Sequence, residues 1–163
     1  MKKLTYLIIS IIFLNLINAC AGYKPIYTTD LQFEIVDYSI KSNNKLGRQI
    51  YYKLHNLFKS SNNNEEAKSI TITIDIQKDK EATTKDSSGK ILEYRIILNS
   101  NIIIKDYLTN DEVLNQNFSY SSMYKAQDLY SETIKLENKS IKNLIDKAYQ
   151  NLMIKMSEKM LTK

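Results

Sequence analysis

The stretch Ile70-Thr71-Ile72-Thr73-Ile74-Asp75-Ile76-Gln77 decides the fold, because an isoleucine occupies every second position. Successive side chains of a β-strand point to opposite faces, so this pattern predicts a strand with one apolar and one polar face. A second alternating run follows over residues 92–105. Its apolar positions are Leu92, Tyr94, Ile96, Leu98, Ile102 and Ile104. Between the runs, Asp86-Ser87-Ser88-Gly89 is a turn signal, so we expect a long hairpin whose charged tip spans Lys78 to Lys90.

Weaker patterns on either side complete the domain. A loose alternation from Thr28 to Ile40 predicts a first strand, and apolar residues at helical spacing predict an amphipathic helix over residues 45–59. Downstream, residues 113–121 are expected to form a fourth strand. From Tyr124 onward the helical period returns and predicts a long C-terminal helix, with Glu137-Asn138 as the place for a bend or an interruption.

The order strand, helix, three strands, helix predicts an α+β domain in which two helices pack on one face of a four-stranded mixed β-sheet. The crossover through the first helix makes the first two strands parallel, and hairpins make the others antiparallel. On the C-terminal helix, Leu144, Ala148 and Leu152 mark the face expected to cover the isoleucines of the second strand. The rear face of the sheet would be polar and would lie in water or against a wet surface.

Composition narrows the class of protein. The chain has 163 residues, enough for one domain, and is 43% hydrophobic and 25% charged, as folded domains are. A single cysteine, Cys20, and a single histidine, His55, exclude a disulfide framework and a Cys/His zinc site. Removing Lys2 and Lys3 with a leader leaves 21 basic against 18 acidic residues, and this net charge of +3 does not indicate a nucleic-acid partner.

Residues 1–19 have the layout of a secretory signal peptide: two lysines, an apolar run from Tyr6 to Leu16 and the small residue Ala19. The run is shorter than the about 20 residues of a membrane span. Ile17-Asn18-Ala19-Cys20 resembles a bacterial lipobox, which implies cleavage before Cys20, acylation of that cysteine and a mature domain over residues 20–163. The alternative is an uncleaved anchor with an incidental cysteine. Ala21 in place of an aspartate resembles enterobacterial sorting to the outer membrane, facing the periplasm.

The start of the mature chain carries a family resemblance. The residues are Cys20, Gly22, Tyr23, Lys24, Pro25, Ile26 and Tyr27, interrupted by Ala21. Further along, Arg95, Asp106 and the turn from Leu108 to Asp111 fit the same pattern, with Asn110 where a glycine is common. Asparagine tolerates the left-handed conformation that such a turn needs. On these residues the chain resembles the alphaproteobacterial branch of the LptE family of lipopolysaccharide-assembly lipoproteins.

The resemblance implies a lipoprotein without enzymatic activity or cofactor. Such a protein occupies the lumen of the outer-membrane β-barrel LptD and assists insertion of lipopolysaccharide into the outer leaflet. The alternative is an envelope lipoprotein of the same layout that acts as a scaffold or assembly factor without touching lipid. A lipid-anchored hydrolase is poorly supported, because His55 has no nucleophile motif beside it and the acidic residues fall in predicted loops and turns.

Five basic residues are candidates for binding lipopolysaccharide, because all lie on or beside the predicted hairpin. They are Lys78, Lys80, Lys85, Lys90 and Arg95. Charge-assisted hydrogen bonds from lysine and arginine suit the phosphates of a lipid A headgroup. The alternative is an ordinary surface role, because Asp79, Glu81 and Asp86 reduce the local charge, and lysines on a hairpin edge prevent strand-to-strand aggregation.

Overall fold

A computed structural model describes residues 33–61 and 67–161. Several predicted features lie outside these described residues. They are the predicted signal sequence, Cys20, the residues up to Tyr27 that carry the family resemblance, and the beginning of the predicted first strand. The elements, in order, are β1 (Phe33–Ser42), α2 (Asn44–Ser61), β2 (Lys68–Lys85), β3 (Ile91–Asp106), β4 (Glu112–Lys125) and α3 (Tyr130–Leu161). The order β-α-β-β-β-α is the predicted one.

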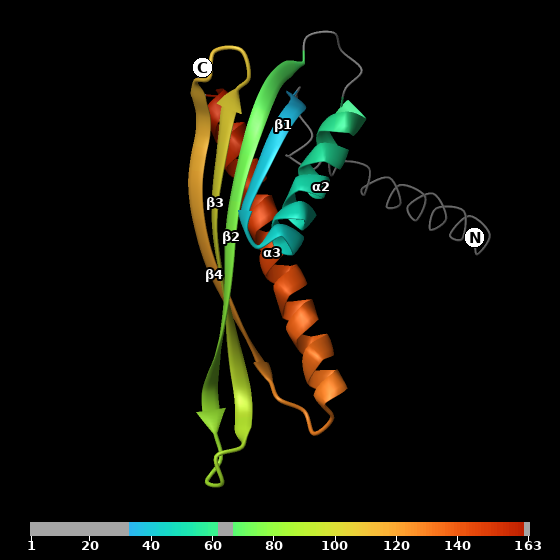
Figure 1. Ribbon diagram of the computed structural model, residues 1–163, viewed down its shortest axis with the longest axis vertical. Helices are drawn as coiled ribbons and strands as arrows, with labels where there is room; N and C mark the ends of the chain where they lie inside the picture. The colour runs from blue at the N-terminus through green and yellow to red at the C-terminus, as the bar shows by residue number, and fades with distance from the viewer. Residues whose placement is uncertain (1–32, 62–66, 162–163) are drawn as a thin grey trace, which may run out of the picture.

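The four strands form one mixed sheet in the order β1-β2-β3-β4. The β1–β2 pair is parallel, whereas β2–β3 and β3–β4 are antiparallel hairpins. Both helices lie on one face of this sheet (Figure 1), with α2 over β1 and β2 and α3 over β4 and β3. The predicted α+β architecture is therefore confirmed. No helix within the described ranges is both long enough and apolar enough to cross a bilayer.

The core follows the isoleucine alternation. Ile70, Ile72, Ile74 and Ile76 are each at most 1% exposed, and the register sets Ile72 opposite Ile104 and Ile74 opposite Ile102. Burying one such side chain contributes about 1.5 to 3 kcal/mol, so this ladder is a principal source of stability. Helix α2 closes one half of the core with apolar side chains at helical spacing. These are Leu46, Ile50, Leu54 and Phe58.

The strands extend further than predicted. Strand β2 continues to Lys85, so only residues 86–90 form the turn, and β4 continues to Lys125. The prediction that the C-terminal helix begins at Tyr124 was wrong, because Tyr124 pairs with Tyr94 of β3 and their rings stack 5.6 Å apart. The long β3 strand offers this segment a hydrogen-bonding partner. Helix α3 itself runs unbroken for 32 residues, without a break at Glu137.

The buried face of α3 is the predicted one, but its neighbour differs. Leu144, Ala148 and Leu152 are at most 4% exposed. We expected them to cover the isoleucines of β2, whereas α3 lies over β3 and β4. The reason is that α2 already covers this face of β1 and β2.

The two ends of the sheet differ in what they carry. Phe33, the start of β1, lies opposite Lys68, and the turn after β3 joins this end through a hydrogen bond from Tyr107 N–H to the Ser69 carbonyl (3.0 Å). The β2–β3 turn projects at the opposite end of the elongated domain (Figure 1). The candidate basic residues therefore lie toward the end away from the start of the described chain.

Candidate functional site

The five predicted basic residues do not gather in one cluster. Lys78 and Lys80 follow Ile76 at even steps along β2, so their side chains point to the helix-covered face. Arg95 precedes buried Ile96 by one residue on β3 and points to the opposite face. Strand alternation thus divides the set between two faces and the turn.

Glu137 of α3 is the centre of the helix-side group. Its Oε1 lies 3.2 Å from Lys78 Nζ and its Oε2 lies 2.6 Å from Lys80 Nζ. The Tyr124 hydroxyl donates a further hydrogen bond to Oε2 at 3.1 Å. The Glu137 side chain is only 10% exposed. These contacts tie β2 and β4 to the first half of α3.

Their mutual contacts hold Glu137 and Lys80 in their charged forms. Burial acts to raise the pKa of Glu137, but hydrogen bonds from Lys80, Lys78 and Tyr124 outweigh it and lower the pKa. For Lys80, burial acts to lower the pKa, and its hydrogen bonds with Glu137 and Tyr124 raise it well above the ordinary value. The Lys80 ammonium also lies 4.3 Å from the Tyr94 ring centroid, a cation–π contact. Lys80 is therefore committed to internal contacts.

Sequence reasoning missed Glu137 as a site residue. The available signal was its spacing, because Thr133, Glu137 and Ser140 precede Leu144 at steps of three or four and share its buried face. A glutamate on the buried face of a helix needs an ion-pair or hydrogen-bond partner, since a buried charge is costly unless it is paired.

The remaining three candidates are accessible. Arg95 Nη1 lies 2.8 Å from Glu81 Oε1 across the strands, with both side chains more than two-fifths exposed. Lys90 Nζ lies 3.1 Å from Asp128 Oδ1 on an open surface. Lys85 has no ion-pair partner within residues 33–61 and 67–161. Because exposed ion pairs contribute at most about 1 kcal/mol, Arg95 and Lys90 can exchange their partners for an anionic ligand.

The sheet face that neither α2 nor α3 covers is polar, as predicted. Asn101 donates through Nδ2 to the side-chain oxygens of Asn115 (3.1 Å) and Asn117 (2.8 Å). Ser119 donates to Asn99 at 2.7 Å. Asn115 in turn donates to the Glu112 carboxylate at 3.1 Å, and Asp75 of β2 lies opposite Asn101. The face thus combines amide and hydroxyl groups with carboxylates, which favours contact with water or a polar surface.

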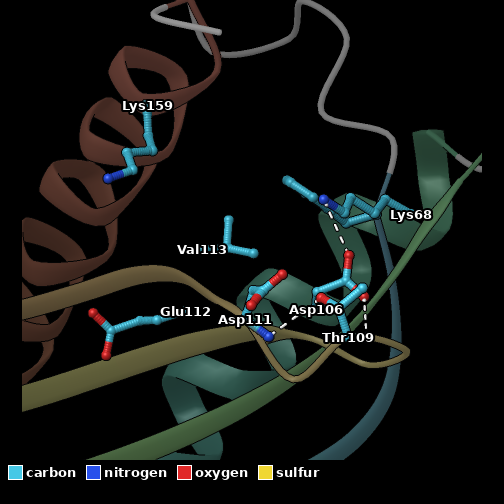
Figure 2. Close-up of a pocket in the computed structure, with 8 residues that line it drawn as sticks. Lys68, Asp106, Thr109, Asp111, Glu112, Val113 and Lys159 are labelled. Carbon is cyan, nitrogen blue, oxygen red and sulfur yellow. Dashed lines mark hydrogen bonds and ion pairs between the residues drawn. The ribbon is translucent and has the colours of Figure 1, made fainter.

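A cavity of about 360 Å³ lies at the other end of the sheet, beside the β3–β4 turn (Figure 2). Asp106 accepts hydrogen bonds from the backbone N–H groups of Leu108 (2.9 Å) and Thr109 (3.1 Å) and pairs with Lys68 at 3.1 Å. The hydrogen bond from Thr109 and the pairing with Lys68 lower the pKa of Asp106. Asn110 has a φ of 60°, the left-handed conformation anticipated there.

Asp106 and Asn110, which both belong to the family resemblance, thus help to form the β3–β4 turn. Lysine and carboxylate side chains are mixed around the cavity, as Lys159, Asp111 and Glu112 in Figure 2 illustrate. Within the described part of the chain, no three histidine, cysteine, aspartate or glutamate side chains are grouped to hold a metal ion.

Comparison with known proteins supports the architecture. Neither a protein-family model nor a curated protein sequence matches the chain. Among solved structures, the rare lipoprotein B from Shewanella oneidensis has a TM-score of 0.55 at 12% identity, covering 77% of this chain and 97% of that one. The chain has the fold of this lipoprotein.

Two further solved lipoproteins have the same fold. Lipoprotein B from Nitrosomonas europaea has a TM-score of 0.55 at 16% identity over 80% of this chain and 86% of its own. A minor lipoprotein from Acinetobacter baumannii has a TM-score of 0.54 at 12% identity over 79% of this chain and 94% of its own. At these identities the likeness establishes the fold alone.

Proposed function

We propose that this chain is an outer-membrane lipoprotein of the LptE type, acylated at Cys20 and facing the periplasm. One observation carries the proposal: the fold is shared with solved lipoproteins over most of their length, in a chain whose single cysteine directly follows a segment with the layout of a signal peptide. More than one acyl chain would make membrane attachment stable. The role is non-enzymatic, since no nucleophile and base motif occurs in the sequence.

In this role the protein binds and plugs an LptD-type β-barrel and assists insertion of lipopolysaccharide into the outer leaflet. The uncovered sheet face supports such a position, because the hydrogen-bonded polar side chains around Asn101 suit a water-filled lumen. Arg95, Lys90 and Lys85 support contact with lipopolysaccharide, because they are accessible cations near the hairpin end. Their charge would serve orientation more than affinity.

A second candidate is an envelope scaffold or assembly factor that does not touch lipid. The observation in its favour is that Lys80, one of the five candidate cations, is held by Glu137 at 2.6 Å and so is not available to lipopolysaccharide. Under this alternative, the remaining cations are ordinary surface charges.

Co-purification tests the proposal. The acylated chain, extracted in mild detergent from its native membrane, should recover an LptD-type barrel as a major partner by mass spectrometry. A variant with Asn101→Asp and Asn117→Asp should recover less barrel, since it adds two negative charges to the uncovered face and breaks its amide hydrogen bonds. The matched control is Lys135→Glu, which changes charge on α3. Recovery of the folded chain without a barrel would favour the scaffold.

A further inference from the structure

A second basic site lies between the two helices, away from the hairpin turn. A cavity of about 390 Å³ is lined by the beginning of α2, the middle of β2 and the first half of α3. Lys45 and Gln49 come from α2, Lys78 from β2, and Asn138 and Lys142 from α3. The volume falls within the about 300 to 1,000 Å³ typical of small-molecule sites.

The cavity carries more positive charge than its own residues neutralise. Lys45 and Lys142 have no hydrogen-bonded or ion-paired side-chain partner within residues 33–61 and 67–161. Lys78 shares Glu137 with Lys80, which lies closer to that carboxylate. Three lysines and one glutamate thus line the cavity, a net charge of +2. Because α2, β2 and α3 each contribute one of these lysines, their positive charges lie around one cavity and repel one another. A bound anion would offset this repulsion.

The net charge of the cavity lining and its hydrogen-bond donors indicate which kind of anion fits. A phosphate monoester carries nearly two negative charges at pH 7, which matches the lining, whereas one carboxylate would leave a charge uncompensated. Ammonium groups bind phosphate as point charges, and the amides of Gln49 and Asn138 add donors. The α2 N-terminus is already capped by Asn43, whose Oδ1 accepts from Leu46 N–H at 3.1 Å, so the lysines carry this assignment.

We propose that the cavity between α2, β2 and α3 binds a phosphate monoester through Lys45, Lys78 and Lys142. The phosphate belongs either to a lipid headgroup or to a soluble phosphate ester. This site does not depend on the barrel partner, because it is built entirely from residues of this chain.

Two probes are used with the full acylated chain. Binding of inorganic phosphate is measured with the chain in detergent. Binding to phosphatidylcholine vesicles is measured with vesicles that contain or lack phosphatidic acid. The test variant is Lys45→Gln with Lys142→Gln. The control is Lys59→Gln with Lys155→Gln, which removes the same charge from the same helices outside the cavity. We expect the test variant to bind phosphate at least about tenfold more weakly than the control, at an unchanged melting temperature.

The two probes separate the sources of the phosphate. A lysine-dependent preference for phosphatidic acid vesicles supports the proposal and identifies a lipid headgroup. Lysine-dependent binding of inorganic phosphate without a vesicle preference supports it and identifies a soluble ester. Equal binding by the two variants, or no binding of either probe, overturns it, whatever barrel co-purification shows.

Discussion

The Lys80 ammonium lies 2.6 Å from the Glu137 carboxylate, so an ion pair joins β2 to α3 between residues 57 positions apart. On β2 the face under the helices carries buried Ile76, followed by Lys78 and Lys80. On α3 the buried face carries Leu144 and, two turns toward the start of the helix, Glu137. A charged contact therefore continues the packing of β2 where its run of buried isoleucines ends. On β3 the apolar core continues, because Ile96 and Leu98, opposite Lys80 and Lys78, are fully buried. Polar bonds from β2 to α3 thus lie beside apolar side chains of β3.

Replacing Glu137 with glutamine should destabilise the fold. The variant leaves Lys78 and Lys80 near one another without an anion, and hydrogen bonds to charged groups contribute about 1.5 to 3 kcal/mol. We expect the free energy of unfolding in urea to fall by about 1 to 3 kcal/mol. Glu158→Gln, at an exposed pair with Lys155 on the same helix, should change it by less than about 0.5 kcal/mol. Equal effects would contradict a special role for Glu137.

The same carboxylate should make stability depend on pH on the acid side. The folded pKa of Glu137 is lowered, so its contribution is complete above the unfolded value of about 4.3 and is lost as pH falls toward the folded pKa. Urea titrations of the native chain and Glu137→Gln should differ at pH 7, and the difference should shrink below about pH 4.3. A constant difference down to pH 3 would show that Glu137 does not titrate in this way.

Gly47 should resist substitution although it lies inside a helix. Alanine normally stabilises a helix by about 1 kcal/mol relative to glycine. Here an added Cβ would overlap Ile40 Cγ2, where α2 lies against β1. We expect Gly47→Ala to lower the free energy of unfolding by about 1 to 3 kcal/mol.

A double-mutant cycle checks that cause. Adding Ile40→Ala removes the overlapping methyl group, so the alanine at position 47 should then cost much less than it does alone. Additive effects of the two changes would show that the contact is not responsible.

Strand alternation in the sequence already fixes the face on which each candidate cation lies. Counting in steps of two from Ile76 places Lys78 under the helices, and counting from Ile96 places Arg95 on the other face. Local patterns could not show that Glu137 would be the partner, because that contact depends on how α3 crosses the sheet. Tyr124 was misplaced for the same reason, since its strand conformation depends on pairing with Tyr94.

Lipid contact through the accessible cations is testable with charge reversal. Arg95→Glu with Lys90→Glu should weaken lipopolysaccharide binding by about 1 to 3 kcal/mol at low salt, because two cations near the hairpin end are replaced by anions. The melting temperature should change little, since both residues form only exposed ion pairs. The control, Lys135→Glu with Lys155→Glu, reverses two charges on α3. Unaltered binding by a folded Arg95/Lys90 variant would discard these residues as the lipid site.

The functional proposal depends first on a lipid at Cys20, which the intact mass of the chain purified from its native membrane measures directly. We predict a polypeptide that begins at Cys20 and carries the added mass of its acyl chains, with the Cys20→Ser variant retaining residues 1–19 and no acyl mass. A native chain that retains residues 1–19, or that begins at Cys20 without added lipid mass, would contradict the proposal.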